Sequence, residues 1–184
     1  FIFDDTILSQ LSKDDARVTF IAKQLENIQH ELKHLGKSLA VFYGNPQEVF
    51  YKLISEQEIK MVFTNHDYEP YARKRDLEIF HLFTKNNIEF KTCKDQVIFE
   101  KNEVTKNDGS PYVVYTPYSN KWKEKFKLTK LTNYNSKDYL SNLTHHSYPF
   151  LKLSDIGFKA SSIKVPNFDV SKSLIDNYEA TRNF

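Results

Sequence analysis

Cysteine, glycine and long apolar runs are scarce in this chain of 184 residues. Its single cysteine, Cys93, excludes a disulfide within the chain and a cysteine-based metal cluster. The four glycines do not form the glycine-rich loop with which many nucleotide-binding proteins surround phosphates. No apolar run approaches the roughly 20 residues that a membrane-spanning helix requires. We therefore expect no membrane partner, and a lone thiol fits a reducing, cytoplasmic location.

The composition is that of an ordinary globular protein. Hydrophobic residues make up 40% and charged residues 27% of the chain, whose length suffices for one domain with a core and an appended segment. The 26 basic and 24 acidic residues leave a net charge of only +2. This balance argues neither for nor against nucleic acid as a partner, because any basic patch would have to be local.

Short apolar runs alternate with amphipathic helical patterns in the first half of the chain. The runs that predict strands are 1–3, 39–43, 60–63 and 88–92. The helices between them are predicted to begin at Asp14 or Asp15, at Asn45–Pro46 and at Pro70. Because strands separated by helices form βαβ units, the pattern predicts an α/β fold. We expect a Rossmann-like or flavodoxin-like parallel sheet with helices on both faces.

The pattern changes after Cys93. Apolar segments at 97–100 and 112–116 flank the turn signal at 107–109, which predicts an antiparallel hairpin or an extended loop. A short helix is expected near Trp122. From residue 128 onward the chain has the composition of a linker, and a last helix is predicted to start between Asp169 and Tyr178.

The segment from Phe63 to Asp76 has the pattern of a strand end, a polar turn and a helix start. Pro70 suits a first helical turn because the N–H that it lacks would have no partner there. Asp67 and Glu69 precede it, where the positive end of a helix favours carboxylates. In an open α/β sheet, such a junction is where ligands bind.

The same segment resembles the N-terminal domain of DNA photolyases and cryptochromes. The matching residues are Asn65, Asp67, Glu69, Pro70, Tyr71, Arg73, Arg75 and Asp76. Three other segments agree in order, and they are Phe1–Asp4 with Asp15–Ile21, Gly109–Trp122, and Tyr178–Phe184. The resemblance implies an antenna-chromophore domain over residues 1–127. It implies an interdomain linker over residues 128–184 that leads to a helical FAD domain.

This resemblance implies that the chain is the N-terminal portion of a cyclobutane pyrimidine dimer photolyase. In that reading the parent protein binds FAD in its helical domain and acts on damaged DNA, and this portion holds a light-harvesting chromophore. A cryptochrome-type blue-light photoreceptor is the first alternative, and a stand-alone nucleotide-binding α/β module is the second. The FAD pocket and the tryptophan relay belong to the helical domain, so we predict no catalytic residue here, and no metal site.

One feature departs from the family pattern. Family members have a further strand and an Arg-rich turn before the segment that is Phe1–Phe3 here. That strand lies in the middle of the sheet, so the strands at Phe1–Phe3 and Lys60–Phe63 are expected to lack their common neighbour. The chain is therefore interpreted as a piece of a longer product, or as a fold in which something else fills the gap.

The resemblance also nominates chromophore-binding residues. In members with a deazaflavin-type antenna, the matching acidic pair and an arginine line the pocket, which points to Asp67, Glu69 and Arg17. The acidic pair can instead serve only the helix start, and Arg17 can instead pair with Asp14 or a helix end.

Three further positions are candidates at the same edge of the sheet. Asn65 can hydrogen-bond a ring edge of the ligand or hold the turn through its own backbone. Phe3 and Asp4 end the first strand, where Phe3 can pack in the core or stack on the ligand. Folate-using members carry an Asn-Glu pair where this chain has Tyr71 and Ala72, so a flavin or deazaflavin is favoured over methenyltetrahydrofolate.

Overall fold

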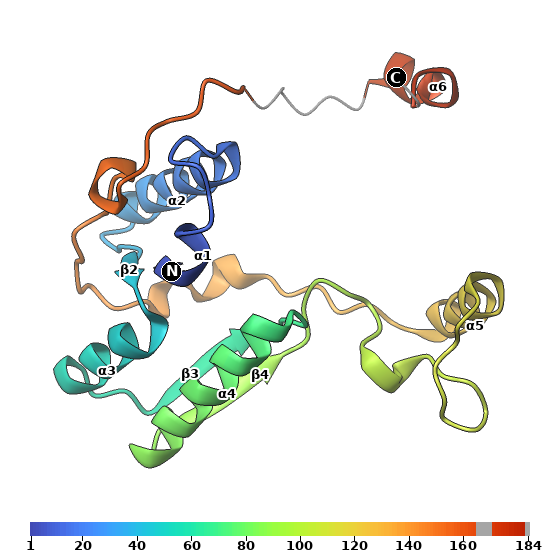
Figure 1. The fold of residues 1–184 in the computed structure, drawn as a ribbon, viewed down its shortest axis with the longest axis horizontal. Coiled ribbons are helices and arrows are strands. Elements are labelled where there is room, and N and C mark those ends of the chain that lie inside the picture. Colours follow the sequence, from blue (N-terminus) through green and yellow to red (C-terminus); the bar gives the residue numbers. More distant parts are fainter. Residues whose placement is uncertain (165–170, 183–184) are drawn as a thin grey trace. The chain divides into compact units, whose positions relative to one another are not determined.

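The computed structural model of the chain describes residues 1–164 and 171–182, which divide into two compact units (Figure 1). Unit 1 contains Phe1, residues 3–43 and the described residues from 145 onward, and unit 2 contains Ile2 and residues 44–144. Asp169, Asn183 and Phe184, on which parts of the sequence-based predictions fall, lie outside the described residues.

Unit 1 is organised around one long helix. Its elements are β1 (Ile2–Asp4), α1 (Asp5–Leu8), α2 (Ala16–His34), β2 (Phe42–Gly44), the 3-10 turn η3 (Leu153–Ile156), α6 (Lys172–Asp176) and α7 (Tyr178–Thr181). Strand β1 pairs with β2. The predicted start of α2 is confirmed, because the Asp15 carboxylate accepts a hydrogen bond from the Arg17 N–H at 2.8 Å. Gly36 follows its end with φ of +66°, a conformation that glycine adopts without strain.

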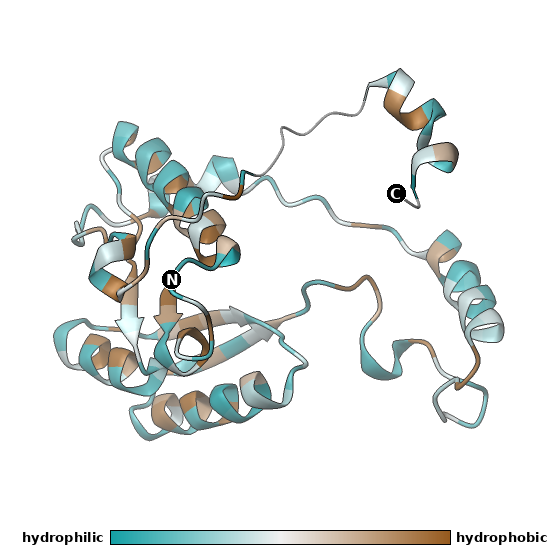
Figure 2. Cartoon of the chain, turned by 45° about the horizontal axis from the view of Figure 1, so that its top comes forward, coloured by the Kyte–Doolittle hydropathy of each residue, from teal (hydrophilic) through white to brown (hydrophobic). Residues whose placement is uncertain are grey.

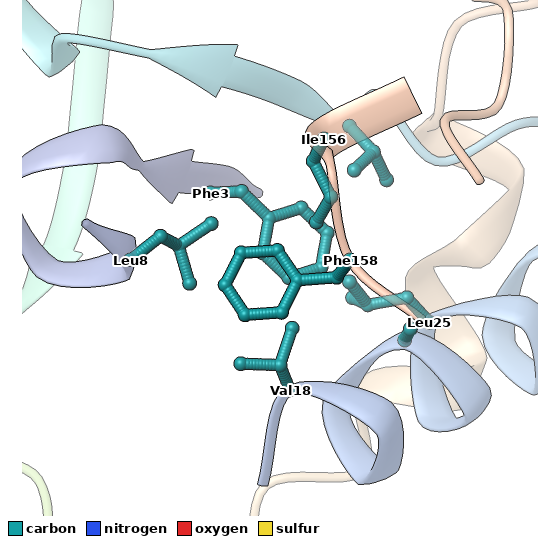
Figure 3. Close-up of a cluster of buried hydrophobic side chains, with 8 residues drawn as sticks. Phe3, Leu8, Val18, Leu25, Ile156 and Phe158 are labelled. Carbon is teal, nitrogen blue, oxygen red and sulfur yellow. The ribbon is translucent and has the colours of Figure 1, made fainter. Parts of the chain in front are cut away.

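The core of unit 1 joins residues that are far apart in the sequence. Figure 3 shows side chains from β1, α1, α2 and the η3 region pointing toward one another, among them Phe3, Leu8, Val18, Leu25, Ile156 and Phe158. Ile156 and Phe158 are each only 3% exposed. The segment that the sequence assigns to the linker thus supplies two buried side chains to this core.

Unit 2 contains a parallel βαβ unit. Its elements are α3 (Pro46–Glu56), β3 (Met61–Asn65), α4 (Pro70–Lys85), β4 (Glu89–Cys93), the 3-10 turn η1 (Lys101–Glu103), α5 (Tyr115–Leu128) and the 3-10 turn η2 (Ser136–Asn142). Strands β3 and β4 run parallel in a register that pairs Met61 with Glu89 and Asn65 with Cys93. The buried core consists of Ile79, Phe83 and Ile88, and Phe83 is completely inaccessible.

The α/β class is confirmed, and the predicted helix starts at Asn45–Pro46 and Pro70 are those of α3 and α4. The described strands form two two-stranded sheets, β1 with β2 and β3 with β4. This pairing agrees with the expectation that the strands near Phe3 and Met61 lack a common neighbour. It also means that the described residues form no single continuous sheet.

The region after β4 differs from one of the two predicted alternatives. Residues 94–144 contain no strand, so the structure has the extended loop and not the hairpin. The turn at Gly109 is present, since the Lys106 N–H donates to the Ser110 carbonyl at 2.9 Å. The segment predicted as extended up to Thr116 already enters α5 at Tyr115. Helix α5 is longer than predicted and mainly hydrophilic (Figure 2), and none of its residues is buried.

Two features are absent from residues 1–164 and 171–182. None of the helices there is both long enough and apolar enough to cross a membrane. No group of three or more His, Cys, Asp or Glu side chains in these ranges is arranged to hold a metal ion.

Candidate chromophore site at the β3–α4 turn

The turn between β3 and α4 has the strand–loop–helix form that its sequence predicts. Glu69 is the N-cap residue of α4 and Pro70 occupies the first turn. The Asp67 carboxylate accepts a hydrogen bond from the Glu69 N–H at 3.1 Å, whereas the Glu69 side chain makes no capping hydrogen bond. Asp67 therefore shapes the turn, and Glu69 remains an exposed carboxylate at the helix start.

A cavity of about 640 Å³ lies beside this turn, between α4 and β4. Helix α4 contributes Arg73, Asp76, Leu77 and Phe80, which share one face because they follow the i, i+3, i+4, i+7 spacing. Strand β4 contributes Phe90, whose ring centroid lies 6.4 Å from that of Phe80. Leu77 and Phe80 are 55% and 43% exposed, so the cavity opens to solvent along an apolar floor.

The polar end of the cavity is formed by a hydrogen-bonded network of four side chains. Glu100 lies in the loop after β4, and its Oε1 contacts both His66 Nδ1 and the Tyr68 hydroxyl, the latter donating at 2.6 Å. His66 Nε2 lies 2.8 Å from Thr92 Oγ1. His66, Tyr68 and Thr92 all line the cavity. The Glu100 side chain is only 14% exposed, and it binds His66 and Tyr68 directly, while Thr92 is held through His66.

The network shifts the pKa values of two of its groups. The hydrogen bond to Glu100 is the main reason that the pKa of Tyr68 is raised to about 12. The same hydrogen bond lowers the pKa of Glu100, with His66 and Lys101 acting in the same direction. An ionised carboxylate only accepts hydrogen bonds, so both His66 Nδ1 and the Tyr68 hydroxyl donate to Glu100.

The next residue, Lys101, has an unusual backbone conformation. Its φ is +41°, in the left-handed region that costs a non-glycine residue about 1–2 kcal/mol. Glu103 holds this turn, because its carboxylate accepts hydrogen bonds from the Glu100 N–H at 2.5 Å and from Lys94 Nζ at 2.9 Å. Lys94 is the main cause of the lowered pKa of Glu103. The Lys125 ammonium also donates to the Glu103 carbonyl, so several contacts hold Lys101 against the cavity.

The three predicted ligand residues of unit 2, Asn65, Asp67 and Glu69, differ in their relation to the cavity. Asp67 lines the cavity, whereas Asn65 and Glu69 are not among its lining residues. The Asn65 side chain donates to Asp95 Oδ2 at 2.9 Å, so it bonds the loop after β4 instead of its own turn. These three residues lie together at the carboxyl end of β3.

The predicted ligand residues of unit 1 all have structural partners. Phe3 is 5% exposed within the core. Asp4 is 6% exposed and caps α1 by accepting from the Thr6 N–H at 2.9 Å. Arg17 forms a salt bridge with Asp15 at 2.6 Å, so its partner is the neighbour of the predicted Asp14. This salt bridge lowers the pKa of Asp15 to about 2.

Sequence reasoning missed the residues that build the polar end of the cavity. His66 and Tyr68 lie inside the motif at 65–71, but they were not selected. Glu100 follows them by more than 30 positions and matches no motif. The one available signal was the parallel sheet itself, since the turn after β3 and the loop after β4 leave the same edge.

The family model described as DNA photolyase matches residues 1–136, which is most of the chain. The chain belongs to the DNA photolyase family. Deoxyribodipyrimidine photo-lyase of Synechococcus sp. is 28% identical over 129 residues, covering 70% of this chain and 27% of that protein. The Halobacterium salinarum protein of the same name is 25% identical over 181 residues, covering 97% of this chain and 37% of that protein.

Similarity extends to proteins named cryptochrome and to a solved photolyase structure. Cryptochrome-1 of Spalax judaei is 28% identical over 100 residues, covering 54% of this chain and 17% of that protein. A class III photolyase from Agrobacterium tumefaciens has a similar fold, with a TM-score of 0.54 at 22% identity over 63% of this chain and 23% of that one. The chain thus spans well under half the length of these photolyase relatives.

Proposed function

We propose that this chain is the N-terminal portion of a light-driven DNA repair enzyme, a cyclobutane pyrimidine dimer photolyase, and that it binds an auxiliary light-harvesting chromophore. The observation that carries the proposal is the cavity at the β3–α4 turn of a photolyase-family domain, with Asp67 in its wall. In the parent protein, a helical domain in cis would hold FAD and damaged DNA would be the substrate. Two relatives that match this chain over 129 and 181 residues are named photolyases, which favours repair.

The cavity suits a flavin or deazaflavin ring. Its volume of about 640 Å³ lies within the range of about 300–1,000 Å³ of small-molecule sites. Phe80 and Phe90 offer aromatic surface for a planar ring, and Asp67 and Thr92 can accept from or donate to its polar edge. When bound, such a chromophore would absorb light and pass excitation to FAD. The residues of this chain would bind it, orient it and shield one face from water.

Methenyltetrahydrofolate suits the chain less well. Ala72 occupies one of the two positions at which folate-using members carry their Asn-Glu pair, and it is 3% exposed in the interior of α4. A methyl group offers no hydrogen bond, and its burial leaves no room for a ligand at that position. The local structure therefore supports the flavin-type alternative.

The proposal is tested on the full-length protein that contains this sequence. Blue light should restore ultraviolet-irradiated DNA, and the action spectrum should contain a band beyond the absorption of FAD. Phe80→Ala should abolish that band while leaving FAD-driven repair, because Phe80 is an exposed part of the proposed ring site, whereas Phe90 also stacks on the buried Phe83. Tyr51→Ala, an exposed aromatic residue on α3, is the matched control. A full-length product that binds no flavin and leaves the DNA unrepaired would overturn the proposal.

A cryptochrome-type photoreceptor is the second candidate, because proteins named cryptochrome-1 are also similar to this chain. It shares the scaffold and the chromophore site. The two candidates differ in one result, since a photoreceptor would bind flavin yet show no repair in the same assay.

A further inference from the structure

We propose that the chromophore bound at the β3–α4 turn carries a phosphate group, which Lys101 and Arg73 bind together. This inference rests on the proposed chromophore-binding function and narrows its ligand to phosphorylated flavin-type compounds. Both cationic residues line the same cavity as the aromatic floor of Phe80 and Phe90. The combination fits a ligand with a planar ring at one end and an anion at the other.

The two cations are available for a ligand. Within the described ranges, neither Arg73 nor Lys101 forms a salt bridge with another side chain. Their neighbours on the same and adjacent turns are paired, since Arg75 binds Asp76 at 2.8 Å and Lys94 binds Glu103 at 2.9 Å. A guanidinium and an ammonium that face one cavity are the groups with which proteins bind phosphate.

The carboxylates of the cavity do not cancel this positive charge. Among the residues that line the cavity, Asp76 is already neutralised by Arg75, which leaves Asp67. The nearby Glu100 is not a lining residue, and its Oε1 is bonded to His66 and Tyr68. Asp67 accepts the Glu69 N–H at the start of α4, where the helix dipole offsets its charge. The side of the cavity that contains Arg73 and Lys101 is therefore the side that favours an anion.

The left-handed backbone conformation of Lys101 supports a role in ligand binding. Its left-handed conformation is retained although it is unfavourable for lysine, because Glu100 and Glu103 hold the turn from both sides. Strained residues that several contacts maintain are concentrated at ligand-binding sites. A glycine or asparagine would occupy this position without strain, yet the chain has a cation there.

The test compares two ligands that differ only in the phosphate. The 184-residue chain is titrated with flavin mononucleotide and with riboflavin, and binding is followed by quenching of flavin fluorescence. We expect flavin mononucleotide to bind at least about tenfold more tightly, with an advantage that shrinks as salt is raised. Lys101→Asn should remove most of this advantage without changing riboflavin affinity, because asparagine tolerates the left-handed backbone. Lys101→Arg should retain the advantage, and Arg73→Gln should lose it.

Lys85→Asn is the matched control, because it removes a lysine from α4 that lines a different cavity. It should change neither affinity. Equal affinity for both flavins would overturn the phosphate site and leave the chromophore function standing. Binding of neither flavin would overturn both. Loss of riboflavin binding in Lys101→Asn, with Lys101→Arg unable to restore it, would show that Lys101 serves only the fold of the turn.

Discussion

The Glu100 carboxylate binds both His66 and Tyr68 at the polar end of the cavity, so removal of its charge should alter both neighbours. Its hydrogen bond to Tyr68 is the main cause that raises the pKa of that phenol from 10.0 to about 12. In Glu100→Gln the side chain keeps its size and can still accept a hydrogen bond, but the negative charge is gone. The pKa of Tyr68 should then fall by more than about one unit toward its usual value near 10.

The assay is nuclear magnetic resonance of tyrosine labelled with ¹³C at Cζ, in which Tyr68 is assigned from a Tyr68→Phe sample. At pH 11 a tyrosine with a pKa of 10 is about 90% ionised, whereas one with a pKa of 12 is only about 10% ionised. Tyr68 should therefore remain protonated while ordinary tyrosines have titrated, and it should join them in Glu100→Gln. Tyr68 ionising with the others in the unaltered chain would refute the network.

The same shifts predict how stability depends on pH. Tyr68 has a raised pKa in the folded chain, so its contribution is complete below about pH 10 and is lost as pH rises toward about 12. Glu100 has a lowered pKa, so its contribution is present above its ordinary value of 4.5 and is lost as pH falls below it. The urea midpoint of the unaltered chain should therefore fall at both acid and alkaline pH. The urea midpoint of Glu100→Gln should fall less at acid pH.

Three further predictions concern the folding of the two units. Phe83→Ala should destabilise unit 2 by about 3–5 kcal/mol, measured by the urea dependence of hydrogen exchange in α4 and β4, while Phe63→Ala, 65% exposed on β3, should cost less than about 1 kcal/mol. Asn45→Ala should cost about 1 kcal/mol in the same measurement, because it removes the cap that Asn45 provides to Gln47 at 2.9 Å. Phe158→Ala should destabilise unit 1 by about 3–5 kcal/mol, seen as lost exchange protection in α2, and unchanged protection there would contradict the packing of Phe158 in that core.

Local sequence patterns predicted the elements well where the controlling interaction is local. Asp15 and Asn45 cap the helices that follow them, and Pro70 stands in the first turn of α4, as their residue types indicate. The Phe63–Asp76 segment also has its predicted form. In each case the relevant partner lies within three residues, so the sequence alone contains the information.

The patterns failed where the partner is distant. The alternative in which Asn65 bonds its own turn is not observed, because its side chain donates to Asp95 across the edge of the sheet. Segment 112–116 is an exception with a local cause: it was expected to be extended, but Tyr115 already belongs to α5, whose Pro117 suits a first helical turn. The burial of Phe158 against α2 could not be read from a segment of linker composition, because it depends on a contact between residues more than 100 positions apart.

The position of the candidate site follows from the register of one strand pair. Asn65 lies opposite Cys93 in the parallel ladder, and the His66 N–H extends it by donating to the Cys93 carbonyl at 2.8 Å. The two strands therefore end at the same edge of the sheet. This brings the loop that contains Glu100 and Lys101 against the turn that contains Asp67. A slip of one residue would turn every side chain of one strand to the opposite face and separate His66 from Glu100. The register of β3 and β4 thus places the aromatic floor, the polar network and the two cations around one cavity.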